Sequence, residues 1–386
     1  MRALTAADVE GVLKPFTEAT ALPLNCYTDP ELYTAEEERI FRREWLLVGR
    51  AEQVEKPGDF FTTQLMNEPL IVLRDDTGTI RCFSSVCRHR GHLLAEGSGH
   101  CRQLVCPYHT WAYGLDGKLL RAPGMDRTPA FDPKAVQLPE LQAEEWLGFV
   151  FVNFDWESAP LGPRLTGLAD FLAPWRPAEM RTAITITYQS EWDWKLMVEN
   201  AMEAYHILGA HQETAQGNIP AERFEAEELD GEDYSLFHMP WGEQVSESDD
   251  VVLMGFPVIE SLPDVEKLRS NFFHVYPTAN LFAFADEMGG LTILPESHGR
   301  HKLVWNIYLP PEDFELPDFE QRLEAIRKSI DEVHHEDMSG CRGTYKGMQS
   351  SLATPSYFSH MEKCVWEFQR WYVRKMAPEL GAKARR

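Results

Sequence analysis

Two cysteines and two histidines stand in matched pairs in the first third of the chain. Cys87-x-His89 is followed, after sixteen intervening residues, by Cys106-x-x-His109, so each short segment offers one thiolate and one imidazole. This set can hold a [2Fe–2S] cluster with two Cys on one iron and two His on the other, because such a cluster takes one Cys and one His from each of two loops. A cluster of this kind carries electrons and performs no substrate chemistry by itself.

Two other metal sites fit the same segment less well. A zinc finger usually pairs its cysteines first and its histidines second, whereas the order here is Cys, His, Cys, His. Plant-type ferredoxins need Cys-x4-Cys-x2-Cys; Cys82 and Cys87 begin that spacing, but Arg90 occupies the third position. The mixed-ligand cluster agrees at every position, and Cys82 and Cys101 are expected to be buried or loop thiols.

A second group of residues with metal-binding chemistry lies further along the chain. His206 and His211 are five residues apart, so both imidazoles can face one metal if the helix loosens near Gly209. Glu203 lies three residues before His206, and Asn200 three before Glu203. Two imidazoles and one carboxylate with open coordination positions form the facial triad of non-haem Fe(II) oxygenases. On spacing alone, two ordinary histidines on a helix are the simpler interpretation.

The wider sequence resembles one known family. Pro107, Tyr108 and Trp111, with the glycines of the intervening loop, give the first constellation the pattern of the Rieske iron–sulfur domain. The run Glu199-Asn200-x2-Glu203-x-Tyr205-His206-x4-His211 resembles the catalytic helix of Rieske non-haem iron oxygenase α subunits. The resemblance runs from the N-terminal helix to the C-terminus and so covers nearly the whole chain.

The sequence differs from known Rieske patterns at three places, the first of which distinguishes two types of Rieske cluster. Respiratory Rieske proteins carry an additional Cys after each ligand His; His92 and Ala112 stand there instead, so the cluster resembles the disulfide-free type of oxygenases and their ferredoxins. The acid before the iron histidines is most often Asp in the family, and Glu203 is the longer variant. Asp193-Trp194-Lys195 replaces the usual Asn-Trp-Lys. None of these changes removes a metal ligand.

The resemblance implies a role for each candidate residue. Glu203 links the iron site to a cluster histidine, and Asn200 lines the surroundings of the iron. The third iron ligand is a carboxylate from a helix well beyond the histidine pair; in the run 333–347 Asp337 is the predicted ligand and the adjacent Glu336 is the alternative. The predicted metal-binding residues are Cys87, His89, Cys106 and His109 for the cluster and His206, His211 and Asp337 for a mononuclear Fe(II).

The same resemblance implies the terminal oxygenase component of a multicomponent system. It would use O₂ to hydroxylate, by mono- or dioxygenation, an aromatic or other apolar small molecule. Because no G-x-G-x-x-G follows a strand, electrons from NAD(P)H would arrive through a separate flavin or iron–sulfur reductase, with or without a ferredoxin. The alternative activity is monooxygenation or N- or O-demethylation of a quaternary amine or an aryl ether. A Rieske electron carrier and a metal or redox sensor are the alternatives outside enzymes.

The assembly that the resemblance implies is a head-to-tail homotrimer. In this family the two metal sites of one chain are too far apart for fast electron transfer, so His109 of one subunit would meet Glu203 of its neighbour. Such a contact joins two different surfaces and closes into a ring. A stacked hexamer remains the alternative.

The elements around these residues predict an α+β fold of two domains. Residues 45–155, with short β-type runs between turn residues, predict an antiparallel β domain for the cluster. Residues 156–386 predict the catalytic iron domain, which by the resemblance is helix-grip-like, with an antiparallel sheet flanked by helices. Residues 1–44 predict a helical segment that packs on the catalytic domain.

Several individual elements can be placed by pattern. A helix is expected over 34–45, with Thr34 as N-cap and Glu37 completing a capping box. Residues 191–209 carry a helical pattern, and 251–308 contain β-rich runs. Segments 224–235 and 243–250 are acidic and polar and predict a mobile loop region. Two apolar helical stripes are expected, one over Phe319, Leu323, Ile326, Ile330 and Val333, the other over Met361, Cys364, Val365, Phe368, Trp371 and Tyr372.

Pocket walls are expected from residues 211–260 and 272–295. Their aromatic residues favour an apolar or aromatic ligand, and the same residue types could form a cage for a trialkylammonium group. The wall candidates are Phe272, Phe273, Phe282 and Phe284. The candidate partners for a substrate carboxylate are Arg223, Lys267, Arg269 and Arg300.

Composition sets the outer limits. The 386 residues carry a formal net charge of −24, which disfavours nucleic acid and anionic membrane surfaces as partners. No apolar run approaches the ~20 residues of a membrane-spanning helix, and the N-terminus does not resemble a signal peptide. Seven cysteines, an odd number, do not indicate a secreted disulfide framework. The expected protein is soluble and cytoplasmic.

Overall fold

The computed structural model describes residues 4–242 and 255–381. The chain forms two compact units, one of residues 42–161 and one of residues 1–41 together with 162–386. In the part of the chain that is described, no helix combines the length and the apolar character that crossing a membrane requires. The polar segment 243–250, for which the sequence predicts a mobile loop, lies outside the described residues.

The unit of residues 42–161 is built from β-strands. Its larger sheet has seven strands in the order β1-β10-β9-β4-β3-β2-β5, and a smaller one has the order β6-β7-β8; all neighbours are antiparallel. The strands are β1 (Leu46–Arg50), β2 (Asp59–Leu65), β3 (Glu68–Arg74), β4 (Ile80–Ser84), β5 (Ser98–His100), β6 (Leu104–Val105), β7 (Ala112–Tyr113), β8 (Leu119–Arg121), β9 (Glu140–Trp146) and β10 (Phe149–Asn153).

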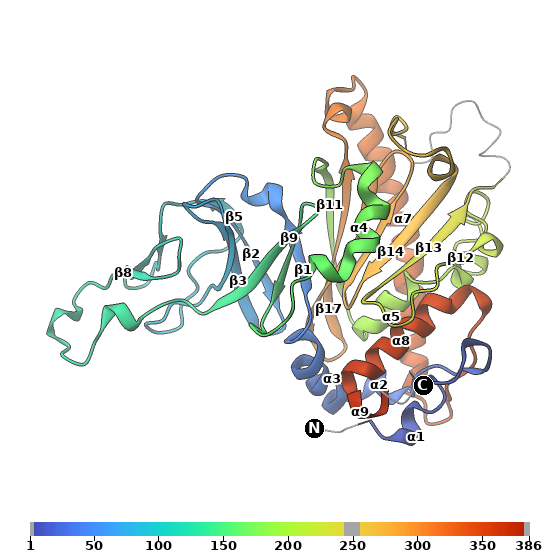
Figure 1. The fold of residues 1–386 in the computed structure, drawn as a ribbon, viewed down its shortest axis with the longest axis horizontal. Coiled ribbons are helices and arrows are strands. Elements are labelled where there is room, and N and C mark those ends of the chain that lie inside the picture. The colour runs from blue at the N-terminus through green and yellow to red at the C-terminus, as the bar shows by residue number, and fades with distance from the viewer. Residues whose placement is uncertain (1–3, 243–254, 382–386) are drawn as a thin grey trace. The chain divides into compact units, whose positions relative to one another are not determined.

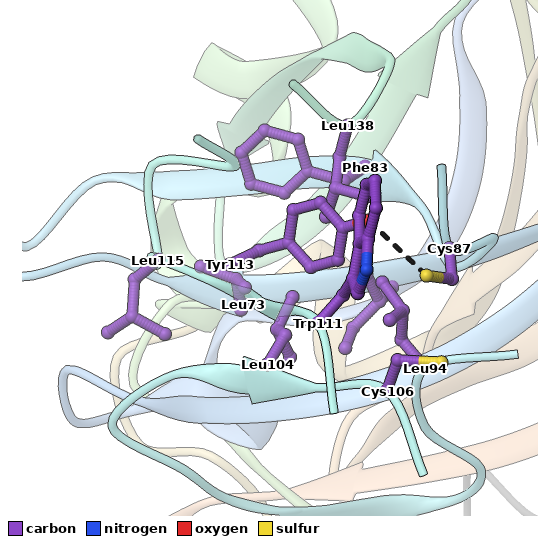
Figure 2. Packing of buried hydrophobic residues seen from close by; sticks show 11 residues of the cluster. Leu73, Phe83, Cys87, Leu94, Leu104, Cys106, Trp111, Tyr113, Leu115 and Leu138 are labelled. Carbon is purple, nitrogen blue, oxygen red and sulfur yellow. Dashed lines mark hydrogen bonds between the residues drawn. The ribbon is translucent and has the colours of Figure 1, made fainter. Parts of the chain in front are cut away.

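The core of this unit includes two of the predicted cluster ligands. Cys87 and Cys106 are buried in an apolar cluster with the rings of Phe83, Trp111 and Tyr113. Figure 2 shows the two cysteine side chains at the same end of this cluster. Their burial places both sulfur atoms at the edge of a rigid, dry core, which fixes the distance between the two loops that carry them.

The other unit contains a second antiparallel sheet of seven strands. Its order is β11-β17-β16-β15-β14-β13-β12, so strands adjacent in sequence mostly pair as hairpins, while β11 joins at the edge beside β17. The strands are β11 (Arg181–Ser190), β12 (Glu225–Ala226), β13 (Tyr234–Pro240), β14 (Arg269–Val275), β15 (Ala279–Ala283), β16 (Met288–Ser297) and β17 (Arg300–Leu309).

Helices cover both faces of this sheet (Figure 1). Phe171 of α4 contacts His238 on one face, at 5.7 Å between ring centroids. On the other face, Ile326 and Ile330 of α7 pack in one apolar cluster with Phe282 and Phe284. The α-helices are α1 (Ala6–Val9), α2 (Asn25–Thr28), α3 (Pro30–Glu36), α4 (Thr166–Leu172), α5 (Trp194–Asn200), α7 (Phe319–Met348), α8 (Lys363–Met376) and α9 (Pro378–Gly381). The α+β prediction is confirmed.

The predicted helix over 34–45 is wrong at both ends. Helix α3 starts earlier, because the Asp29 side chain caps it and Pro30 occupies the first helical position. Thr34 lies inside the helix, where its hydroxyl donates to the Pro30 carbonyl at 3.0 Å. The chain continues as one π-helical segment, Glu37–Phe41, and then leaves the helix. The Asp-Pro start outcompetes Thr34 as the cap.

Other predicted elements are confirmed in part. The pattern over 191–209 gives the short helix α5 and, after a break, a 3-10 turn over Tyr205–Leu208. The segment 224–235, predicted as loop, contains β12 and the start of β13. The two C-terminal stripes lie on α7 and α8 with their apolar faces inward, except that Met361 falls in the 3-10 turn His360–Glu362 just before α8.

Candidate metal centres

The four predicted cluster ligands lie on two turns of the same backbone geometry. In each turn the cysteine N–H donates to the carbonyl five residues ahead, at 2.9 Å for Cys87 and 2.8 Å for Cys106. The cysteine carbonyl accepts from the N–H four residues ahead, and that residue has a positive φ: 77° at Gly91 and 56° at Thr110. Glycine adopts this conformation freely, but a β-branched residue is strained there. The turn that carries His109 therefore holds backbone strain.

The side chains of these turns converge. The rings of His89 and His109 lie 4.6 Å apart between centroids and nearly perpendicular, at 80°. The thiols of Cys87 and Cys106 contact each other. Burial raises the pKa of the Cys87 thiol, and the Tyr113 hydroxyl, 3.3 Å from its sulfur, acts in the opposite direction. Figure 2 marks this Tyr113–Cys87 contact.

These residues fit a [2Fe–2S] cluster. The His89 ring stacks on Trp111 at 4.8 Å, and its Nδ1 is buried without a hydrogen-bond partner among the described residues. An orphaned imidazole nitrogen beside two buried thiols is the donor set that such a cluster takes. The His109 ring instead contacts Tyr108 at 3.9 Å between centroids, tilted by 45°, and the Tyr108 side chain is 56% exposed. The neighbour of His109 is therefore exposed to solvent, while His109 itself is partly buried.

The predicted iron residues converge at a second place. The Oδ1 atom of Asp337 lies 2.9 Å from His211 Nε2 and 3.5 Å from His206 Nε2. One ligand atom from each of the three residues lies within 4.8 Å of the others. Burial alone would raise the pKa of Asp337, but the hydrogen bond from His211 and the charges of the imidazoles lower it below its usual value. Two imidazoles and one carboxylate fit a mononuclear Fe(II).

Each histidine also has a carboxylate at its other ring nitrogen. Glu203 Oε1 lies 2.8 Å from His206 Nδ1, and Glu336 Oε2 lies 2.7 Å from His211 Nδ1. A hydrogen bond at Nδ1 fixes the tautomer and leaves the lone pair on Nε2 for a metal. Asp337 faces the two Nε2 atoms, while Glu336 supports His211 from behind. The geometry therefore favours Asp337 over Glu336 as the iron ligand.

Helix α5 positions Asn200 and Glu203, and a buried ion pair holds its start. Asp193 is the N-cap, and its carboxylate accepts from the Lys195 N–H at 3.0 Å. The Lys195 ammonium, fully buried, lies 2.8 Å from the same carboxylate and 2.6 Å from Glu36. The replacement of the family's usual Asn by Asp193 thus supplies both a cap and a counter-charge.

Two side chains of the sheet hold the other end of α5. Asn280 Nδ2 donates to the carbonyl of Met197 at 3.3 Å, and His274 Nε2 donates to that of Ala201 at 2.9 Å. Asn280 and His274 are cross-strand partners on β15 and β14. Burial lowers the pKa of His274 to about 3, so the ring is neutral and its Nδ1 accepts from Ser235. The Met197 carbonyl also accepts from the Ala201 N–H, and the Ala201 carbonyl lies at the helix end. The two side chains together fix the turn toward the predicted iron ligands.

Sequence comparison identifies both units. Residues 177–378 match the family described as ring hydroxylating alpha subunit (catalytic domain), which is more than half of the chain. Residues 44–132 match the Rieske [2Fe–2S] domain. The chain belongs to the Rieske oxygenase α-subunit family. The predicted family, and with it the [2Fe–2S] cluster and the mononuclear iron as its cofactors, is confirmed.

Named relatives of this Rieske oxygenase subunit act on quaternary amines. The glycine betaine monooxygenase oxygenase subunit of Chromohalobacter salexigens is 39% identical over 194 residues, which are 50% of this chain and 43% of that protein. The chloroplastic choline monooxygenase of Beta vulgaris is 28% identical over 367 residues, 92% of this chain and 77% of that protein. The chain thus spans about half the length of several curated relatives that it matches.

Solved structures share the fold. A quaternary ammonium Rieske monooxygenase in complex with L-carnitine has a TM-score of 0.80 and 22% identity, covering 97% of this chain and 100% of that one. Naphthalene 1,2-dioxygenase from Rhodococcus sp., bound to indole, has a TM-score of 0.79 and 18% identity, covering 97% of each chain. At these identities the likeness concerns the fold alone.

The predicted iron ligands, His206, His211 and Asp337, border a cavity of about 260 Å³. Its wall is largely aromatic: Phe282 and Phe284 stack at 4.4 Å between centroids, and Phe237 and Phe272 stack at 4.9 Å. Phe273, predicted as part of the wall, is not among the lining residues. Successive side chains of β14 point to opposite faces of the sheet, so Phe273 is buried on the other side.

The basic residues considered as carboxylate partners do not reach this cavity. No Lys or Arg lines it within the described part of the chain. Each candidate is bound elsewhere: Arg223 to the carbonyl of Trp241, Lys267 to Asp264, Arg269 to Glu266 and Arg300 to Glu296.

Sequence reasoning missed several residues at this site. Trp305 of β17 lines the cavity, 5.9 Å from Phe282 between centroids, and His274 and Asn280 also line it. The pairing register of the sheet places these side chains of β14, β15 and β17 on one face. The sequence pattern does not specify that register. His334, one turn before Asp337, is fully buried against Tyr188.

Proposed function

We propose that this protein is the terminal oxygenase component of a multicomponent system that takes electrons from a separate reductase. One observation carries the proposal: a single chain contains two turns whose buried cysteines and converging histidines lie together and, in its other unit, two histidines and one carboxylate within 4.8 Å beside a cavity. When bound, the cluster supplies electrons singly and the iron supplies the position at which O₂ is activated.

The chain's own residues perform three tasks in this proposal. His206, His211 and Asp337, which line the cavity, would hold the iron there. Glu203 and Glu336 hold the two rings in the tautomer that binds metal. The aromatic wall excludes water, which protects the reaction from solvent.

We propose further that the active assembly is a head-to-tail homotrimer of chains, each with a cluster domain at residues 45–155, a catalytic domain at residues 156–386 and an N-terminal segment 1–44 that packs on it. Glu203 supports this, because its Oε1 contacts the His206 ring and its Oε2 accepts from the His206 N–H, which fixes the carboxylate beside a predicted iron ligand. From there it could link the iron toward a neighbour's His109. A solved relative with 21% identity is described as showing inter-subunit electron transfer. Electrons then derive from NAD(P)H through the reductase, with or without a ferredoxin.

The substrate class that we favour is a quaternary ammonium compound, which the enzyme monooxygenates. The aromatic wall without a basic side chain suits a cation, because ring faces attract a trialkylammonium group by about 0.5–2 kcal/mol each. The named relatives, which act on glycine betaine, choline and carnitine, support the same class. The second candidate is an aromatic hydrocarbon, which the same phenylalanines would accommodate.

The direct test is a single turnover. Protein with a reduced cluster and bound Fe(II) is mixed with O₂ and, in separate runs, choline, glycine betaine, carnitine or naphthalene. The expected result is O₂ consumption coupled to an oxidised product with one of the quaternary amines. An iron content near one per chain would contradict the two-site assignment. Full iron content with no product from any compound would favour a sensor or carrier.

The proposed role of Glu203 has its own test. Glu203→Gln, loaded with excess Fe(II) to offset any weaker hold on His206, should retain both metal sites and slow reoxidation of the cluster during turnover, measured by stopped-flow absorbance. The control is Glu213→Gln, which alters an exposed acid in the same segment. Unchanged reoxidation in Glu203→Gln, at unchanged iron content, would refute the linking role.

A further inference from the structure

The segment that follows β8 covers the core beside the cluster turns and exposes its outer side chains. Residues 119–135 run through two 3-10 turns, Met125–Arg127 and Pro133–Ala135, and extend away from the strands of their unit (Figure 1). On its inner side, Phe131 packs against the apolar core that contains Cys87 and Cys106. On its outer side, most residues are exposed. The segment therefore presents a solvent-facing surface directly over the core of the cluster site.

A path of aromatic rings connects this segment to one predicted cluster ligand. The Phe131 ring lies 5.4 Å from the Trp111 ring between centroids, and Trp111 stacks on His89 at 4.8 Å and 11°. Trp111 is 4% exposed, so protein atoms rather than solvent surround the middle ring of the path. The other predicted ligand histidine, His109, contacts Tyr108 instead. The two histidines thus have separate aromatic neighbours, and the ring path begins at His89.

The charge of this region is opposite to that of the whole chain. Residues 87–135 contain seven Lys or Arg against four Asp or Glu, a net charge of +3 in a chain of −24. All seven cations are exposed: Arg88, Arg90, Arg102, Lys118, Arg121, Arg127 and Lys134. Lys118 pairs with Asp116 at 2.9 Å, and the other six form no ion pair within the described part of the chain. Exposed cations without partners attract an acidic protein and raise its rate of association.

The strand register brings part of this charge next to the cluster turns. Strand β8 pairs with β7, and Arg121 lies opposite Ala112, the residue that follows Trp111. Arg88 and Arg90 belong to the first cluster turn. Exposed cations therefore lie at both ends of the ring path, on the segment after β8 and on the turn of the ligand histidine.

We infer that the reductase docks, through an acidic surface, on the exposed cations beside this ring path, an inference that rests on the proposed function. We call these cations the entry face: Arg88, Arg90, Arg121, Arg127 and Lys134. One electron passes from the reduced group of the reductase to the oxidised cluster by way of Phe131, Trp111 and His89, and no bond forms or breaks. In the proposed trimer His109 meets a neighbour's Glu203, so entry at one histidine leaves the other for exit.

Binding of a plant-type [2Fe–2S] ferredoxin, a small acidic electron carrier, to the metal-loaded oxygenase tests the entry face. Both proteins are oxidised, and isothermal titration at several salt concentrations measures the affinity, which should fall as salt rises. Arg121→Glu/Arg127→Glu should weaken binding about tenfold, because two attractions become repulsions. The matched control, Arg181→Glu/Lys328→Glu, reverses two exposed cations of the catalytic unit and should bind as the wild type does.

The ring path has a test of its own. Reduced ferredoxin is mixed with the oxygenase in a stopped-flow instrument, and the rate of cluster reduction is measured at saturating ferredoxin. Phe131→Leu should lower this rate severalfold at unchanged affinity. The matched control is Phe60→Leu, because Phe60 packs on the same core and, in the part of the chain that is described, makes no ring contact with Trp111.

The inference is overturned if ferredoxin does not bind, if its affinity is independent of salt, if the control reversal costs as much, or if Phe131→Leu reduces at the wild-type rate. It is also overturned if Arg121→Glu/Arg127→Glu keeps its affinity for ferredoxin but changes its oligomeric state in size-exclusion chromatography, since the entry face would then bind a second copy of this chain. The absorption spectrum of the cluster verifies that each variant is folded. The single-turnover test of the proposed function starts from reduced protein without ferredoxin, so its failure is distinguishable from these results.

Discussion

The two metal-binding regions of the chain acquire their ligands in opposite ways. The predicted cluster ligands come from two turns between residues 87 and 109 that repeat one set of local hydrogen bonds. The predicted iron ligands come from distant segments, since Asp337 lies 126 positions after His211 and reaches it only because α7 packs across the sheet. The first site is determined by local backbone geometry, and the second depends on the tertiary structure of a whole unit.

The two regions also differ in exposure. The cluster turns leave Tyr108 open to solvent and His109 partly exposed, whereas His211 and Asp337 are 3% and 8% exposed. A partly exposed histidine beside an exposed tyrosine suits a site that must exchange electrons with another protein, while a triad with two buried members suits chemistry that must exclude water. The cluster turns are therefore the expected place of electron entry and the triad that of oxygen chemistry. If so, changes at one site should leave the other intact.

The largest expected effect is the loss of one metal site without the other. Cys106→Ser should abolish the cluster spectrum and leave iron bound at His206, and His206→Ala should do the reverse, because the sites belong to units with separate cores. Substrate oxidation should fall to background in both variants. Iron content and electron paramagnetic resonance check this. Loss of both metals from either variant would show that the units depend on each other.

Truncating an aromatic side chain of the cavity comes next. Phe282→Ala should lower the free energy of unfolding by about 3 kcal/mol, because Phe282 is buried among Phe284, Phe272 and Trp305. Leu120→Ala, in the cluster unit, is the control and should cost less than about 0.5 kcal/mol, since that side chain is 60% exposed. Urea denaturation measures both, and similar losses would contradict the assignment of Phe282 to a packed wall.

Asp75, in the cluster unit, should make the free energy of unfolding depend on pH in the acid range. Burial would raise the pKa of this carboxyl, but hydrogen bonds from Thr77 and Arg81 lower it from 3.8 to about 2. A lowered pKa stabilises the fold above the unfolded-state value, and that contribution is lost as the pH falls through about 2. Asp75→Asn should therefore cost up to about 2 kcal/mol at neutral pH and almost nothing near pH 2.

Denaturation of wild type and Asp75→Asn at a series of pH values measures this dependence. The difference between the two proteins should shrink as the pH falls from about 4 to about 2. A difference that stays constant over that interval would mean that Asp75 contributes by packing and not by charge.

The smallest effect is expected for Glu336, which contacts the His211 ring nitrogen that faces away from the predicted iron. Glu336→Gln should weaken iron binding about tenfold, because Glu336 fixes the tautomer of His211 and is itself held by the Thr214 hydroxyl at 2.7 Å. The cluster should be unaffected. The control is Glu332→Gln, one turn earlier on α7 and exposed. Chelator competition measures the affinity, and total loss of iron from Glu336→Gln would instead favour Glu336 as a direct ligand.

The same contrast explains what the sequence predicts. Cys87, His89, Cys106 and His109 are recognisable because local spacing determines their turns. Asp337 and Glu336 cannot be separated by spacing, since adjacent acids on a helix point to different sides, and only the packing of α7 against His211 distinguishes them.

The missed residues depend on features that no local pattern carries. The pairing of His274 with Asn280 requires the register of β14 and β15, and the end of α5 depends on these two side chains. The start of α3 was predicted wrongly for a local reason. Two residues could cap this helix, and Asp29 followed by Pro30 does so in place of Thr34. The overall α+β class survives such errors because apolar periodicity is summed over whole elements.

The distance along the chain between His211 and Asp337 has a thermodynamic consequence. The 126 positions between these residues mean that the unfolded chain does not hold them together, so an iron bound by both would be lost on unfolding. Because only the folded unit would bind it, the free energy of iron binding would add to the free energy of folding. Removal of iron should therefore lower the stability of the catalytic unit as well as its activity.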